Sequence, residues 1–250
     1  MFSIVGSEIR DWLWELAECP STNTWAKENS ARLKHGQAVF TPQQTAGRGQ
    51  WGRAWLAPAG VLTVSFVLDL PGAICPGFTL GVGLAVLYAV EALCAFGPGG
   101  VGIKWPNDLY ADDRKLGGIL CETLPSKPGT RVIVGIGLNR AVDLAQAPHL
   151  SQAISLQQIS ETVPDQGELL EQIRVYLLQA WGVLIHQGLT PLVPDLNRYH
   201  ILQGKQISIQ RDQEIVKGIV TGINSKGQLE LRLAAGETIT IAQGQITEWC

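Results

Sequence analysis

Phe78–Gly97 restricts the fold of this chain more than any other segment, because twenty residues in a row carry a single charge, that of Glu91. A helix of about 20 apolar residues is long enough to cross a bilayer. Basic residues normally flank such spans and set their orientation, but the nearest ones here are Arg53 and Lys104. We therefore expect a helix buried in the core of a globular protein rather than a membrane span.

Size and composition agree with a globular protein. The chain has 250 residues, enough for a large domain with or without a small one, and 46% of them are hydrophobic. Charged residues make up only 16%, and the net charge is −3. A general nucleic-acid binder would carry a basic stripe and a high pI, so this class is excluded.

The cysteines and the first residues of the chain indicate its compartment. The five cysteines form no C-x-x-C pair, which argues against a structural zinc site. Met1–Trp14 contains Glu8, Arg10 and Asp11, so it does not read as a secretory signal. We expect a reducing, cytoplasmic location for the protein.

The first 197 residues mix strand and helix patterns. Ser21–Asn23 can cap a helix through Trp25–Leu33, and Glu168–Gln187 shows amphipathic helical spacing. Gln146–Pro164 is mixed, with helical leanings. β-rich runs predict strands at six places: Ala38–Thr41, Val61–Leu68, Val101–Trp105, Leu109–Ala111, Gly117–Glu122 and Val132–Gly137. The charged segment Asp112–Lys115 predicts a hairpin tip. This part of the chain, residues 1–197, is therefore expected to be an α+β domain.

The pattern changes after Pro194. Five short alternating segments follow between Gln206 and Trp249, separated by turns such as Asn224–Gly227, which is typical of a small antiparallel barrel. We place the boundary near 195–203 and divide the chain into domains 1–197 and 198–250.

One glycine-rich segment has a composition suited to binding a charged, planar ligand. Gly47–Gly52 matches G-x-G-x-x-G, but the loop continues to Gly60 without opening into a helix, so the dinucleotide-binding interpretation fails. The segment Gly47–Trp55, called the strap below, carries two arginines and two tryptophans. Arginine donates to phosphate or carboxylate in a planar fork, and tryptophan covers a ligand. A plain flexible surface loop is the alternative.

Two further motifs carry cations at strand ends. Lys104–Asp108 ends one strand with a lysine, an aromatic ring and two polar side chains, although a simple Asx–Pro turn would also explain it. Lys115–Ile119 has paired glycines that let a ligand approach the backbone. Ile133–Asn139 is an apolar strand that ends in asparagine, which a purely structural role also explains. No Ser-His-Asp or Cys-His arrangement is recognisable, so we expect electrostatic catalysis on bound anions.

These motifs, in this order and spacing, are similar to those of the biotin protein ligases. The resemblance rests on Ser21–Asn23, Gln44–Trp55, Lys104–Tyr110, Lys115–Leu120 and Gly135–Asn139, and it spans nearly the whole chain. It implies a mixed catalytic domain whose central β-sheet is flanked by helices, as in class II aminoacyl-tRNA synthetases, and an SH3-like C-terminal barrel. It also implies that biotin and MgATP form biotinoyl-5′-AMP, and that a lysine of the biotin carboxyl carrier protein then receives the biotin. The resemblance further implies a homodimer formed through the catalytic-domain sheet.

The resemblance also assigns roles to residues of this chain. Lys115 and Arg48 are the implied catalytic residues, and Asp108 is a weaker candidate for orienting or deprotonating the incoming lysine. No protein ligand to metal is implied, because Mg²⁺ arrives with ATP. The implied biotin-binding residues are Ser21, Thr22, Asn23, Gln44, Arg48, Gly49, Gln50, Lys115 and Gly118. The implied ATP and adenylate contacts are Arg53, Trp55, Lys104, Asn107 and Asn139.

Two departures from the family pattern bear on function. Gln50 and Trp51 replace the two central arginines of the usual G-R-G-R-R-G-R loop, so we expect weaker retention of the adenylate unless Trp51 covers it. The S-T-N motif begins at position 21, which leaves no room for an N-terminal DNA-binding domain, so a ligase without repressor function is expected. The alternatives are a lipoate ligase, an octanoyltransferase with Cys121 as its cysteine, or a non-catalytic biotin-binding module.

Overall fold

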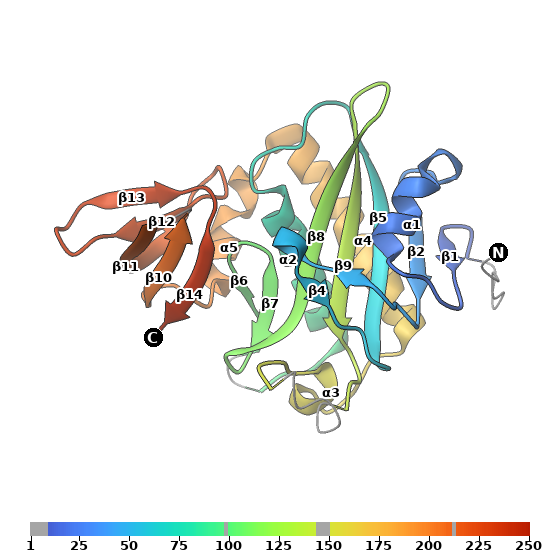
Figure 1. Ribbon diagram of the computed structural model, residues 1–250, viewed down its shortest axis with the longest axis horizontal. Helices are drawn as coiled ribbons and strands as arrows, with labels where there is room; N and C mark the ends of the chain where they lie inside the picture. Colours follow the sequence, from blue (N-terminus) through green and yellow to red (C-terminus); the bar gives the residue numbers. More distant parts are fainter. Residues whose placement is uncertain (1–9, 98–99, 144–150, 212–213) are drawn as a thin grey trace.

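Strand β5 (Val61–Leu70) and its neighbour β9 (Thr130–Asn139) form the centre of the larger of two main sheets in the computed structural model (Figure 1). The structure describes residues 10–97, 100–143, 151–211 and 214–250. The two strands pair antiparallel over their full length, from Val61 opposite Asn139 to Leu70 opposite Thr130. Their valines, isoleucines and leucines favour a strand covered on both faces, and Asp69 is the half-buried exception in β5.

The sheet has seven strands in the order β1-β2-β5-β9-β8-β7-β6. Only β1 and β2 are parallel neighbours, and the other pairs are antiparallel. The five remaining strands are β1 (Leu13–Glu15), β2 (Ala38–Thr41), β6 (Gly102–Lys104), β7 (Asp108–Ala111) and β8 (Arg114–Pro125). The predicted hairpin tip is confirmed, because Asp112 and Asp113 both have positive φ and link β7 to β8 in a two-residue turn.

The apolar segment of the sequence forms the buried helix α2 (Phe78–Leu93). It packs against α4 (Gln166–Gln187), and Gly81 brings the two helices together, since a Cβ there would lie 2.9 Å from Leu184 Cδ1. Both helices cover the face of the sheet that lies behind it in Figure 1. Within the described ranges, no helix has the length and apolarity needed to cross a bilayer.

The opposite face of the sheet carries α1 (Thr22–Glu28) and the strap, whose short strands β3 (Gly47–Arg48) and β4 (Ala54–Trp55) pair with each other. Figure 1 shows this hairpin in front of β8 and β9. The 3₁₀ turn Gln50–Gly52 forms its tip. Among the described residues, the sheet therefore has one face covered by two long helices and one face covered only by the short helix α1 and the strap.

The predicted helix through Trp25–Leu33 is shorter than expected. It begins at Thr22, because the Ser21 side chain accepts a hydrogen bond from the Thr24 backbone N–H. It ends at Glu28, because the Asn29 side chain donates to the Trp25 carbonyl, and a 3₁₀ turn at Ser30–Arg32 follows. In the mixed segment Gln146–Pro164, only α3 (Leu156–Ile159) is helical, and residues 146–150 lie outside the described residues.

The C-terminal residues form the second main sheet, which is antiparallel in the order β13-β12-β11-β10-β14. Its strands agree closely with the five predicted segments: β10 (Gln206–Arg211), β11 (Glu214–Ile223), β12 (Leu229–Arg232), β13 (Thr238–Ile241) and β14 (Gln245–Trp249). Helix α5 (Val193–Tyr199) follows the 3₁₀ turn Thr190–Leu192 and runs across the proposed boundary at 197/198, which stays a prediction.

Backbone contacts dock this small sheet onto the larger unit. The Trp105 indole Nε1 donates to the Gly227 carbonyl at 3.0 Å. A Cβ on Gly227 would lie 2.5 Å from the Gly77 Cα, so the two glycines touch without side chains between them. Asn197 of α5 exchanges two hydrogen bonds with the backbone of Ile223, at 2.7 and 3.1 Å. The C-terminal sheet is therefore held beside the edge of the larger sheet that ends in β6 (Figure 1).

Candidate active site

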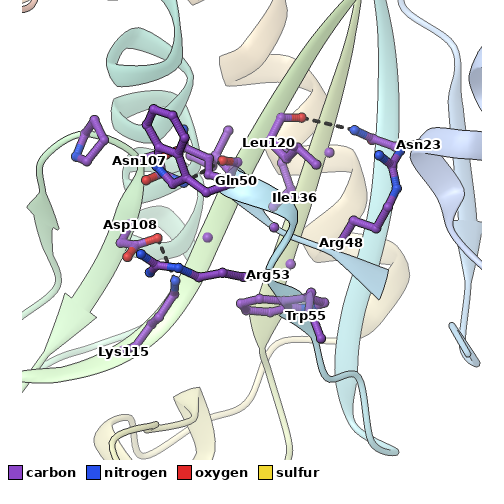
Figure 2. Close-up of a pocket in the computed structure, with 18 of the residues that line it drawn as sticks. Asn23, Arg48, Gln50, Arg53, Trp55, Asn107, Asp108, Lys115, Leu120 and Ile136 are labelled. Atoms are coloured by element: carbon purple, nitrogen blue, oxygen red, sulfur yellow. Dashed lines mark hydrogen bonds and ion pairs between the residues drawn. The ribbon is translucent and has the colours of Figure 1, made fainter. Parts of the chain in front are cut away.

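A pocket opens on the strap side of the large sheet, over the glycine-containing parts of β8 and β9 (Figure 2). Several segments far apart in the sequence line it, among them the start of α1, the strap, the Lys104–Asp108 turn, the two floor strands and Gly244–Ile246. The lining includes all but one of the residues predicted for the site, namely Ser21, Thr22, Asn23, Gln44, Arg48, Gly49, Gln50, Arg53, Trp55, Lys104, Asn107, Lys115 and Gly118.

Buried polar side chains form one wall of the pocket at the start of α1. The Thr22 backbone N–H donates to Gln44 Oε1 at 2.9 Å. The Ser65 hydroxyl lies 2.7 Å from Thr22 Oγ1 and 2.6 Å from Asn23 Oδ1, and the Asn23 amide donates to the Leu120 carbonyl. Because these groups fix one another, the wall is ready to bind a polar ligand without rearrangement. Sequence reasoning missed Ser65, which lies inside an apolar strand.

Glycines of β9 form the floor. A Cβ on Gly135 would lie 2.4 Å from Asn23 Oδ1, and one on Gly137 would lie 2.4 Å from Trp55 Cε2. The Trp55 indole therefore packs directly against the strand backbone, as seen in Figure 2. Its Nε1 is buried and has no hydrogen-bond partner among the described residues. A flat ring in a pocket wall suits an aromatic ligand that can stack on it.

Glu122 of β8 holds the strap, and sequence reasoning did not single it out. Its carboxylate accepts hydrogen bonds from Arg48 Nη2 at 3.0 and 3.3 Å, from Lys27 Nζ at 2.8 Å and from Asn23 Nδ2 at 2.9 Å. Burial alone would raise the pKa of Glu122, but the bonds from Lys27 and Asn23 and the charge of Arg48 hold it below its usual value. An acidic residue within an apolar strand was the signal available in the sequence.

Two lysines lie across the pocket from the polar wall at Ser21–Asn23. Lys115 Nζ lies 2.7 Å from Asp108 Oδ1 and 5.6 Å from the centroid of the Trp55 ring. Lys104 is 8% exposed, and burial lowers its pKa to about 8; Asp108 opposes the shift, and Lys115 and Arg53 add to it. The side-chain nitrogen of Asn107 is not directed at the two lysines, because it donates to the Ile119 carbonyl at 2.8 Å.

Asn139 is the predicted site residue that does not line the pocket. Its side-chain amide donates to the carbonyls of Lys115 at 3.2 Å and Ile154 at 3.0 Å. It therefore ties the start of β8 to the segment before α3 and fixes the backbone that carries Lys115. Its predicted contact with adenosine stays a prediction.

Cys121 faces away from the pocket. Side chains alternate along β8, and the Cys121 thiol lies beside Thr79 of α2, on the helix-covered face. Burial raises the pKa of this thiol to about 12, so it stays protonated. This position does not fit a cysteine nucleophile for acyl transfer.

The C-terminal sheet contributes Gly244–Ile246 to the pocket rim, which sequence reasoning also missed. No motif marks these residues, because their role depends only on how the two sheets dock. Among the described residues, no three His, Cys, Asp or Glu side chains come together as a metal cluster. Cations on three elements, a flat indole and a polar wall define the pocket as a site for anionic ligands that carry ring systems.

Comparisons with known proteins identify the family. Residues 15–139 match the Biotin/lipoate A/B protein ligase family, and residues 203–246 match the Biotin protein ligase C terminal domain. A biotin–[acetyl-CoA-carboxylase] ligase of Mycobacterium tuberculosis is 32% identical over 241 residues, which are 92% of this chain and 86% of the relative. The chain belongs to the biotin/lipoate A/B protein ligase family, as the sequence motifs predicted.

Two further relatives extend the comparison. The bifunctional ligase/repressor BirA of Salmonella typhimurium is 31% identical over 217 residues, and the match covers 84% of this chain and 66% of BirA. The chain thus spans about two thirds of that relative's length. The solved biotin protein ligase of Aquifex aeolicus, in complex with biotin and ATP, is 25% identical with a TM-score of 0.79; the match covers 94% of this chain and 97% of that one.

Proposed function

We propose that this protein is an ATP-dependent biotin protein ligase that attaches biotin to a lysine of a biotin carboxyl carrier protein. The observation that carries the proposal is one continuous pocket in which the polar wall at Ser21–Asn23 faces the cations Arg53, Lys104 and Lys115. The relative from Mycobacterium tuberculosis, matched over 86% of its length, is named a biotin–[acetyl-CoA-carboxylase] ligase, and the Aquifex aeolicus structure holds biotin and ATP.

In the first step, the biotin carboxylate attacks the α-phosphorus of MgATP, a P–O bond forms, and pyrophosphate leaves. Both reactants are anions, so their approach is unfavourable unless cations neutralise them. Lys115 is positioned for this role, since Asp108 fixes its ammonium at 2.7 Å beside the glycine floor. A well-placed cation or donor of this kind contributes about 10²- to 10³-fold in rate. Mg²⁺ would stabilise the charge on the phosphates, and Asp108 is the one acidic side chain among the described residues that line the pocket.

The polar wall and Trp55 divide the pocket between the two ligands. Ser21, Thr22 and Asn23 offer donors and acceptors that suit the ureido ring of biotin. Trp55 packs on the glycine floor of β9 and offers a flat face to adenine. Arg48 and Gly49 of the strap close over the bound adenylate and exclude water.

In the second step, the amine of the carrier lysine attacks the acyl carbon, the C–N bond forms, and AMP leaves with the anhydride oxygen. The amine must lose a proton to react. Asp108 is the carboxylate nearest to this chemistry, and we assign it the proton or the orientation of the amine. The carrier protein, a cytoplasmic location and the homodimer that the family resemblance implies belong to this proposal as well. The five cysteines, all free, agree with a reducing compartment.

The proposal is tested by pyrophosphate release with biotin and ATP, followed by labelling of a carrier domain. Lys115→Ala should lower pyrophosphate release by about 10²-fold or more without loss of fold. Lys205→Ala is the matched control, because Lys205 also pairs with an aspartate, Asp113, but lies outside the pocket lining. Pyrophosphate release that persists in Lys115→Ala would contradict the assignment of this lysine. Lipoate as a competing substrate separates this activity from that of a lipoate ligase.

A further inference from the structure

Lys104 is enclosed by two aromatic rings, and one of them comes from the C-terminal sheet. Its Nζ lies 3.5 Å from the centroid of the Trp249 ring on β14 and 4.9 Å from that of the Tyr110 ring on β7. The ammonium also donates to the Tyr110 hydroxyl at 3.3 Å. The two rings meet edge to face with their centroids 6.1 Å apart. A cation at van der Waals distance from an indole face is attracted strongly when water is excluded.

This arrangement leaves the lysine with one open direction. Lys104 lines the pocket, whereas Trp249 does not, so the rings lie behind the ammonium and the cavity lies in front of it. The other charged groups that act on the ammonium are Asp108, Lys115 and Arg53, all of which line the same pocket. A buried cation backed by two rings and facing a pocket is held ready for an anionic group of the ligand.

We propose that Trp249 is a positioning residue of the active site, which together with Tyr110 holds the Lys104 ammonium against the ATP phosphates. The C-terminal sheet thereby acts on nucleotide binding through Lys104, in addition to the rim residues Gly244–Ile246. This inference rests on the proposed ligase function.

Kinetics of Trp249→Leu and Trp249→Phe test the inference with biotin and ATP as substrates. We expect the KM for ATP to rise about tenfold in Trp249→Leu and much less in Trp249→Phe, which keeps an aromatic face behind the cation. The KM for biotin should stay within about twofold of wild type. Trp12→Leu is the matched control, because Trp12 also faces cations, Arg10 and Arg174, but lies outside the pocket lining.

The pH profile supplies a readout that a purely structural role would not change. Lys104 is charged below its pKa of about 8, so ATP-dependent activity should fall as the pH rises through that value. Leucine in place of Trp249 leaves room for water at the ammonium. Burial is the largest cause of the lowered Lys104 pKa, so we expect this pKa to rise and the alkaline decline to move to higher pH, although the loss of attraction to the ring opposes the change. Lys104→Arg keeps its charge at all these pH values, so the decline should disappear.

Three results would overturn the inference. The first is that Trp249→Leu has the same KM for ATP and the same alkaline decline of activity as the control Trp12→Leu. Another is an equal rise in the KM values for ATP and biotin, which would mean general damage to the pocket. The third is Trp249→Phe behaving like Trp249→Leu while both keep the wild-type melting temperature. Absence of pyrophosphate release in the wild type would instead refute the proposed function itself.

Discussion

Glu122→Gln tests whether the Glu122 carboxylate holds the strap over the pocket. Glu122 accepts hydrogen bonds from Arg48 of the strap and from Lys27 and Asn23 of α1, so one carboxylate joins three groups on two elements. Glutamine keeps the size of the side chain and one acceptor oxygen but removes the charge that both cations face. The substitution therefore removes both ion pairs and leaves at most neutral hydrogen bonds in their place, with little change in the packing of β8.

The exposure of each partner sets the size of the effect. The side chains of Arg48 and Lys27 are 42% and 32% exposed, whereas that of Glu122 is 19% exposed. Pairs this accessible to water contribute at most about 1 kcal/mol each. The Arg48 pair is the one that resists opening of the strap, and about 1 kcal/mol corresponds to about a fivefold change in an equilibrium. The Lys27 pair acts on stability instead, and its loss should lower the melting temperature by about 2–4 °C.

The assay follows release of preformed biotinoyl-AMP from the protein by its hydrolysis in solution, with no carrier domain present. Glu122→Gln should release the adenylate about three to five times faster than wild type. Lys27→Met is the control, because it removes the other cation and leaves the Arg48–Glu122 pair intact. Unchanged release in Glu122→Gln, or equal acceleration in Lys27→Met, would show that Glu122 does not hold the strap.

Three other predictions follow from single positions. Gly137→Ala puts a Cβ 2.4 Å from Trp55 Cε2, so we expect the KM for ATP to rise at least about tenfold. Gly182→Ala is the control, because a Cβ there meets no atom of the described residues within 4 Å. An unchanged KM for ATP in Gly137→Ala would refute the packing argument. Gln50→Arg restores a cation at the pocket rim and should reduce biotinylation of bystander lysines, whereas equal leakage from both proteins would exclude a role for this position. Burial lowers the pKa of His200 to about 4, so this histidine stays neutral in the folded state while the unfolded chain takes up a proton below pH 6.5. The unfolding free energy should therefore fall between pH 6.5 and 4, by up to about 1.4 kcal/mol per pH unit, and His200→Leu should lack this part of the slope in chemical denaturation; parallel curves for the two proteins would contradict it.

Local pattern was enough to predict much of the fold. The low charge of Phe78–Gly97 predicts a buried helix, and α2 occupies most of that segment. The strand runs and the five C-terminal segments were also predicted within a few residues, because alternation and turn chemistry are local properties. Helix ends were less accurate: Asn29 ends α1 by bonding the Trp25 carbonyl, and composition does not reveal that choice.

Site residues were predicted where they belong to a sequence motif. Those that reach the pocket only through the packing of the two sheets were not predicted. The strap, the Ser21–Asn23 wall and the two lysines line one pocket, as their shared chemistry suggested. Glu122 escaped notice because its three partners lie 74 to 99 residues away in the chain. Trp249 and Gly244–Ile246 belong to a different sheet, and no spacing rule links them to Lys104. Contacts of this kind depend on tertiary packing alone.

The glycine pair at the junction of the two sheets limits how the C-terminal sheet could be exchanged. Gly77 and Gly227 touch through their backbones, and a Cβ on Gly77 would also lie 2.4 Å from Leu189 Cδ2. A larger residue at Gly77 or Gly227 cannot be offset by a smaller residue at the other position, because glycine is already the smallest residue. A chimera that grafts the C-terminal sheet of a relative onto this catalytic unit must keep glycine at both positions, or the donor sheet would be displaced from the active-site rim.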